Sequence, residues 1–198
     1  MKTLVLCILF LVPGKGCFSQ LSYTDSLTRE RKKNELEFLS KVLNEEERKI
    51  HPEICYFPID THFIVTADFI KEVGPAFVMP MSKERTVYYR KAGYLSFQIN
   101  DTLCKLNVYQ NLELSGKKAY KNYYFVPFKD ATTGISTYGA GKYLDVYLNK
   151  KAKKVTLDFN TSYHPYCAYS DRYSCPIVPK ENRIDVSVTA GECYVSHD

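Results

Sequence analysis

Short segments of strand-like hydrophobic pattern follow one another from about residue 55 onward. They are rich in β-branched and aromatic residues and are separated by turn signals. The predicted strands cover residues 61–70, 86–90, 94–99, 103–109, 123–128, 142–148, 154–159 and 184–190. Residues 91–93 and 100–101 are predicted to be turns, the second one in a hairpin. No segment of helical pattern separates these strands, which argues against parallel crossovers. The pattern predicts a mainly β fold, as an antiparallel β-barrel or a two-layer β-sandwich.

The pattern before this region is helical and strongly polar. Leucines recur near helical spacing over residues 22–43, and Ser22 with Asp25 is a plausible helix start. A second short helix is expected after Asn44, because Glu47 stands at the position that completes a capping box. These one or two short helices form a predicted N-terminal appendage, residues 20–53, that contributes packing and no chemistry. The β domain is expected over residues 54–198.

The first 19 residues have the pattern of an export signal. Lys2 precedes an apolar run, residues 4–12, which is broken by Pro13-Gly14. A run of this length is too short for a membrane-spanning helix, so no stable membrane anchor is expected after cleavage. We expect a signal peptide over residues 1–19, cleavage near Ser19, and a periplasmic or secreted protein. Acylation at Cys17 is the less favoured alternative, since Lys15 is unsuited to a lipoprotein signal.

The composition favours strands and gives no electrostatic sign of a nucleic-acid partner. The chain has 17 Tyr, 11 Phe and no Trp, which is typical of strands and half-wet surfaces. Its 27 basic and 22 acidic side chains give a formal charge of +5. Cleavage would remove Lys2 and Lys15 and no acidic residue, leaving a nearly neutral protein. Nucleic-acid binding proteins concentrate basic residues on one face, and none is predicted here.

Residues 158–183 form the most unusual stretch. Between residues 160 and 182 the chain has neither helical nor alternating period, yet it carries four tyrosines, at positions 163, 166, 169 and 173. Such a long aromatic connection is expected to be ordered. Cys167 and Cys175 are expected to form a disulfide that clamps it, although the five cysteines after residue 19 leave one unpaired. Metal binding by these cysteines with His164, or a nucleophilic cysteine, are the alternatives.

A second candidate loop covers residues 130–141, where hydroxyls and glycines follow a strand. It could present backbone N–H groups to an anion, or be a plain wide hairpin with glycines at positive φ. Five carboxylates fall in or near the two loops: Asp130, Asp158, Glu181, Asp185 and Glu192. Of these, Asp158 and Glu181 lie at the two ends of the longer loop. The four histidines have no metal-binding spacing, and no catalytic or cofactor motif is present, so no metal or cofactor is expected.

The C-terminal half contains YYFVPFKDATTGISTYGAGKYLDV and LDFNTSYHPYCAYSDRYSCPIVPKENRIDVSVTAGE. These stretches resemble the DUF1684 family, a domain of unknown function, strongly over residues 123–192 and more weakly upstream. The family pattern falls on Phe128, Asp130, Thr132, Thr137, Tyr138, Gly139, Gly141, Asp158, Phe159, Asn160, Tyr163, Pro165, Cys167, Cys175, Pro176, Glu181 and Asn182. Where this chain has His164, the pattern places Asn, which counts against His164 as a ligand or base. The resemblance implies importance for these residues and no mechanism.

Three hypotheses follow for the function. The leading one is a protein that binds a small or extended polar ligand between the 130–141 and 160–182 loops. Its predicted ligand-binding residues are Asp130, Thr132, Thr137, Tyr138, Gly139, Asp158, Asn160, Tyr163, Glu181 and Asn182. The second is a hydrolase-like or metal-dependent enzyme that uses carboxylates of the same loops. The third is a purely structural cluster without a ligand.

Overall fold

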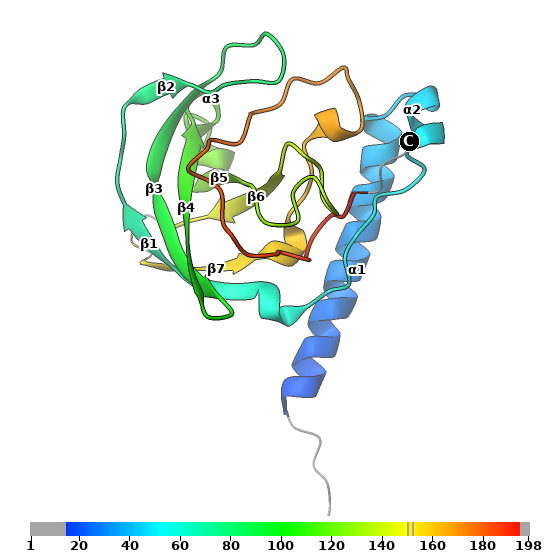
Figure 1. Cartoon of the computed structure of the whole chain (residues 1–198), viewed down its shortest axis with the longest axis horizontal. Coiled ribbons are helices and arrows are strands. Elements are labelled where there is room, and N and C mark those ends of the chain that lie inside the picture. Colours follow the sequence, from blue (N-terminus) through cyan, green and yellow to red (C-terminus); the bar gives the residue numbers. More distant parts are fainter. Residues whose placement is uncertain (1–14, 150, 152, 195–198) are drawn as a thin grey trace, which may run out of the picture.

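A computed structural model describes residues 15–149, 151 and 153–194. Its centre is a seven-stranded antiparallel sheet with the path β6-β5-β4-β3-β1-β7, and β2 pairs with β3 beside this path. The strands are β1 (Ile64–Lys71), β2 (Ala76–Val78), β3 (Tyr88–Ile99), β4 (Thr102–Asn111), β5 (Tyr123–Phe128), β6 (Lys142–Tyr147) and β7 (Lys154–Asp158). The sheet curls into an open, barrel-like shell (Figure 1). The predicted mainly β, antiparallel, barrel-like fold is confirmed.

The longest strand pair, β3 with β4, confirms one predicted turn and corrects the other. Asn100 at the hairpin turn has a φ of 51°, a conformation that Asn tolerates better than most residues. Residues 91–93, however, do not form a turn, because β3 continues through them with a register shift between Lys91 and Gly93. Gly93 is needed there, since a Cβ would lie 2.3 Å from the Ile70 carbonyl oxygen. A bulge with a close backbone approach explains this glycine.

The predicted strand at residues 184–190 is wrong. Its side chains do alternate, with Ile184, Val186 and Val188 buried in the core, but the segment joins no sheet. Its carbonyl groups are bonded by other means: Ala131 N–H donates to Val186, and the buried Lys142 ammonium donates to Val188 and Ala190. The alternation therefore reflects the burial of an extended segment whose start pairs with residues 129–131 only through an isolated parallel bridge.

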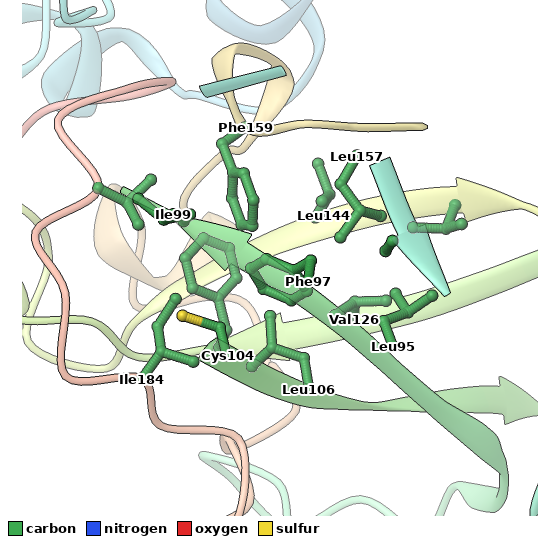
Figure 2. Packing of buried hydrophobic residues seen from close by; sticks show 14 of the residues in the cluster. Leu95, Phe97, Ile99, Cys104, Leu106, Val126, Leu144, Leu157, Phe159 and Ile184 are labelled. Carbon is green, nitrogen blue, oxygen red and sulfur yellow. The ribbon is translucent and has the colours of Figure 1, made fainter. Parts of the chain in front are cut away.

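The core lies inside the curl of the sheet. Figure 2 shows Phe97 and Phe159 packed against each other, and their ring centroids lie 5.6 Å apart. Leu95, Leu106 and Val126 surround them with no exposed surface. Because Phe159 directly follows β7, its burial anchors the start of the long loop in the core. Burying such side chains stabilises the fold by roughly 1.5–3 kcal/mol each.

Two helices precede the sheet: α1 (Lys15–Lys41) and α2 (Glu45–Ile50). The predicted capping box of Asn44 and Glu47 is confirmed, with both hydrogen bonds present. Helix α1 is longer than predicted because it begins at Lys15 and runs through residue 19. The rest of the predicted signal peptide, residues 1–14, lies outside the described residues. No helix in the described residues is long and apolar enough to cross a membrane.

A disulfide joins Cys55 to Cys193 and links the start of the β region to its end. The predicted Cys167–Cys175 disulfide is wrong for this structure, in which both cysteines are free thiols. They are nevertheless neighbours, because the Cys167 N–H donates to the Cys175 sulfur at 3.3 Å. Spacing in the sequence identified two adjacent cysteines, whereas the disulfide connects cysteines 138 residues apart.

Candidate functional site

A cavity of about 680 Å³ lies between one face of α1 and the first part of the long loop. We call it the α1 groove. Helix α1 contributes Glu30, Arg31, Asn34, Glu37, Phe38 and Lys41, and residues 54 and 56 continue that wall. The facing side is built from residues 160–164, 166, 169 and 192, with Asp145 and Tyr147 of β6. The N-terminal helix therefore forms one wall of the groove in addition to packing on the barrel.

Three buried side chains form a hydrogen-bonded chain in the groove lining. The Tyr138 N–H donates to His164 Nε2 at 3.3 Å, so the proton of the neutral ring is on Nδ1. His164 Nδ1 lies 3.4 Å from the Tyr169 hydroxyl, which donates to Glu192 Oε2 at 2.9 Å. The backbone N–H of His164 also donates to Glu192 Oε2, at 2.7 Å. Glu192 Oε2 is thereby held by the Tyr169 hydroxyl and by the backbone of His164.

Burial moves the pKa values of these two groups in opposite directions. It raises the pKa of Glu192 to about 7, although the His164 N–H and the Tyr169 hydroxyl both favour its ionised form. Burial lowers the pKa of His164 to about 3, and the positive charge of Lys142 adds to this effect. His164 is therefore neutral at neutral pH, while Glu192 takes up or releases a proton there. A carboxyl that titrates near neutrality inside a cavity is a typical functional-site feature.

Arg31 connects α1 to the loop at this wall. Its guanidinium donates to the carbonyls of Phe57 and Asn160, both at 2.9 Å, and lies 4.6 Å from the centre of the Tyr56 ring. Asn160 is fully buried and bonds both backbone groups of Asp60. These contacts hold the helix against the barrel side (Figure 1).

The β6 side of the groove carries a carboxylate surrounded by tyrosines. The hydroxyls of Tyr123 and Tyr163 donate to Asp145 Oδ1 at 2.9 and 3.0 Å. The Tyr147 ring packs beside Tyr123 with a centroid separation of 5.8 Å and is 66% exposed. Since alternate residues of a strand share a face, Asp145 and Tyr147 both point away from the core.

The 130–141 loop is largely self-contained. Asp130, Thr132 and Thr137 are buried, and the Thr132 N–H and hydroxyl both donate to Asp130 Oδ1. The Thr132 and Thr137 hydroxyls lie 3.0 Å apart, and the Lys142 ammonium lies 3.3 Å from Asp130 Oδ2. Burial lowers the pKa of Lys142, while Asp130 opposes this change. Asp130 Oδ2 is buried and has this ion pair but no hydrogen-bond partner among the described residues.

The remaining predicted residues have separate surroundings. Tyr138 contacts His164 and Tyr194 by its ring, and the exposed Gly139 accepts a hydrogen bond from Lys129. Asp158 caps the turn at residues 159–161 and accepts a hydrogen bond from Tyr23. Glu181 is exposed. Among the ten predicted ligand-binding residues, Asn160 and Tyr163 line the groove.

Asn182 is a structural residue. It is fully buried, and its amide donates to the carbonyls of Asn107 and Pro127 at 2.9 and 2.7 Å. Its oxygen accepts from the Asn107 N–H. These bonds attach the end of the long loop to β4 and β5. Glu181 and Asn182 therefore have unlike roles despite being neighbours in the sequence.

The tip of the long loop is clamped by charge. Glu47 of α2 accepts hydrogen bonds from the Arg172 guanidinium at 3.2 and 2.7 Å and from the Ser170 hydroxyl at 2.6 Å. These contacts, with the N-cap bond from Asn44, lower the pKa of Glu47 to about 2. A two-point carboxylate–arginine pair therefore holds the loop tip, in place of the predicted Cys167–Cys175 disulfide.

Sequence reasoning missed Arg31, Asp145 and the role of Glu192. Glu192 was among the five carboxylates considered, but residue type alone did not distinguish it from the others. Asp145 lies on a predicted strand whose alternation places it on the outer face, and that signal was available. Arg31 lies in a charged helical run and had no distinguishing signal. Among the described residues, no three His, Cys, Asp or Glu side chains are grouped so as to hold a metal ion.

A protein of known structure has a similar fold. The solution structure of an uncharacterized protein from Haloarcula marismortui is similar with a TM-score of 0.67 and 30% identity, covering 89% of this chain and 96% of that one. No curated protein matches this chain. Residues 50–193 match the family model described as a protein of unknown function, DUF1684, and the chain therefore belongs to the DUF1684 family.

Proposed function

We propose that this protein binds a small polar ligand in the α1 groove. The observation that carries the proposal is the groove itself, which has ionisable and hydrogen-bonding side chains on both walls and a buried, titrating Glu192 in its lining. Concave sites with a few convergent polar groups are the usual form of small-molecule sites. We keep the ligand-binding hypothesis drawn from the sequence but move the ligand from between the 130–141 and 160–182 loops to the α1 side of the 160–182 loop.

Blocking the groove tests this proposal. Asn34 is an exposed α1 residue that lines the groove, whereas the equally exposed Lys33 lies outside the lining. We expect Asn34→Trp to fill the groove and Lys33→Trp to leave it open. The measurement is thermal stabilisation of both variants and the wild type by a panel of cationic, neutral and anionic small polar compounds. Compounds that bind the wild type should stabilise Lys33→Trp equally and Asn34→Trp not at all. Equal stabilisation of both variants would contradict the proposal.

A second candidate function is acid–base chemistry on the bound ligand. The pKa of about 7 for Glu192 favours it, because general acids and bases work best near the ambient pH. The enzymatic alternative then depends on Glu192, with His164 and Tyr169 as positioning residues, and no longer on Asp130, Asp158 or Glu181. Turnover of a ligand that is lost in Glu192→Gln while binding persists would support this function.

We also propose that the protein is exported. The apolar run at residues 4–12 supports this, and so does the Cys55–Cys193 disulfide, since disulfides persist in oxidising compartments. Cleavage near Ser19 would leave every groove residue in the mature chain, because the first one is Leu27. The test is N-terminal sequencing of protein from the native host. A chain that retains residues 1–19 and remains in the cytoplasm would contradict export.

A further inference from the structure

We infer that the ligand of the α1 groove carries an organic ammonium group. This inference rests on the proposed function and specifies its ligand class. Three features of the groove lead to it: its balance of charges, its aromatic rings, and a carboxylate that keeps one oxygen available.

The groove has more carboxylates than cations, although the whole chain has a formal charge of +5. Its acidic lining residues are Glu30, Glu37, Asp145 and Glu192, the last only partly ionised at neutral pH because its pKa is raised to about 7, and its basic ones are Arg31 and Lys41. Lys41 pairs with Glu37 at 3.5 Å. Arg31 keeps its charge while two carbonyls hold its position, and the remaining carboxylates outnumber it. The groove thus has an excess of acidic groups, although the protein as a whole is positively charged. This excess favours a positively charged ligand.

Aromatic rings occur on both walls. Phe38 of α1 packs against Tyr166 and Tyr169, with centroids 5.7 and 4.8 Å apart, while Tyr147 and Tyr163 lie on the β6 side. The faces of such rings attract cations, and aromatic cages are a known form of site for quaternary ammonium groups. The groove already contains one such contact, that of Arg31 with the Tyr56 ring.

Asp145 is the expected anchor for the charge. Both of its tyrosine partners donate to Oδ1, and Oδ2 has no hydrogen-bond partner among the described residues. The carboxylate is thus oriented by Tyr123 and Tyr163 and can accept from, or attract, a cation beside the exposed Tyr147 ring. The described residues do not supply the grouped ligands of a metal site, so the chemistry favours an organic cation over a metal ion.

Titration calorimetry with choline and with its uncharged isostere 3,3-dimethylbutan-1-ol tests the inference. The full chain, Asp145→Asn, Tyr147→Leu and the control Asp185→Asn are compared. Asp145→Asn keeps an acceptor for the two tyrosine hydroxyls, and Asp185 is an exposed carboxylate outside the groove. We expect choline to bind at least about tenfold more tightly than the isostere. Asp145→Asn and Tyr147→Leu should each weaken it by about tenfold, and added salt should weaken it further. Asp185→Asn should bind as the wild type does.

Spermidine, glucose, citrate and Ca²⁺ are the other probes. Spermidine binding without choline binding would still support an ammonium ligand, recognised through its N–H donors. If glucose or citrate binds and Asn34→Trp blocks it, while both ammonium probes fail, the proposed function stands and this inference is wrong. Binding of Ca²⁺ alone would overturn it as well. If no probe that binds is affected by Asn34→Trp, both the inference and the proposed function fail.

Discussion

Asn182 and Glu181 differ in what their side chains do, although both fit the same family pattern. Asn182 satisfies three buried backbone groups, whereas Glu181 is exposed. We expect Asn182→Ala to destabilise the protein by about 2–4 kcal/mol, because buried donors and acceptors lose their partners. Glu181→Ala should change stability by less than about 0.5 kcal/mol. Urea denaturation measures both, and equal effects would contradict the structural role of Asn182.

The opposite pKa shifts of Glu192 and His164 predict how the stability of the protein depends on pH. The pKa of Glu192 is raised from its ordinary 4.5 to about 7, so the folded state keeps this proton up to a higher pH than the unfolded state does. This contribution to stability falls as pH rises from about 4.5 to 7. The pKa of His164 is lowered from 6.5 to about 3, so its contribution rises over the overlapping range. The two effects oppose each other between about pH 4.5 and 6.5.

Variants separate the two contributions. Between pH 4.5 and 6.5, the unfolding free energy of Glu192→Gln minus that of the wild type should rise with pH. The same difference for His164→Asn, which introduces the residue of the family pattern, should fall. Each slope is limited to about 1.4 kcal/mol per pH unit, the value for one proton. Urea midpoints measured at several pH values provide the test, and parallel profiles for all three proteins would contradict the assigned pKa shifts.

At the scale of elements, sequence patterns identified strands better than their connections. The hydrophobic run at residues 123–128 matches β5 at both ends, and the hairpin at Asn100-Asp101 is present. The predicted break at residues 91–93 failed because Gly93 serves a bulge rather than a turn. The strand predicted at residues 184–190 is wrong because alternation is also produced by a buried extended segment that belongs to no strand of the sheet. Tertiary contacts decide between these outcomes, and local pattern does not contain them.

The candidate site shows the same limit. The long loop was predicted to be ordered and to line a site, and residues 160–164 do line the α1 groove. Its partner wall could not be predicted, because a polar helix with solvent-facing charges gives no sign of which face meets the barrel. Arg31 binds the backbone carbonyls of residues 57 and 160. Any residue type can supply such a carbonyl, so these contacts can be found only once the fold is known.

The link between α2 and the loop tip gives a prediction at this scale. Glu47→Gln should release residues 170–173, because it removes the charge that pairs with Arg172 and leaves one oxygen where Ser170 and the Asn44 N–H now use two. Glu46→Gln is the matched control, since Glu46 is an exposed neighbour in the same helical turn that pairs with Lys49. Hydrogen exchange of the 170–173 amides should accelerate in the first variant only. Unchanged exchange in Glu47→Gln would show that other contacts order the tip.

At the scale of the whole molecule, the disulfide joins the two ends of the β region. We expect peptide mapping of unreduced, denatured and alkylated protein to yield Cys55 linked to Cys193, with Cys104, Cys167 and Cys175 alkylated. Removing this link should destabilise the protein by roughly 2–5 kcal/mol, since it closes a long loop of the unfolded chain. A peptide that links Cys167 to Cys175 would contradict the assignment.

The molecule as a whole is a curled sheet with a helix along its side, and we propose that the ligand binds between the two. The most direct test is nuclear magnetic resonance of the ¹⁵N-labelled protein titrated with choline. We expect the shifted amide signals to cluster at Arg31, Asp145, residues 160–169 and Glu192, and Asn34→Trp to remove these shifts. Shifts that cluster at residues 130–141 and leave the α1 residues unchanged would contradict the account and return the site to the loops first indicated by the sequence.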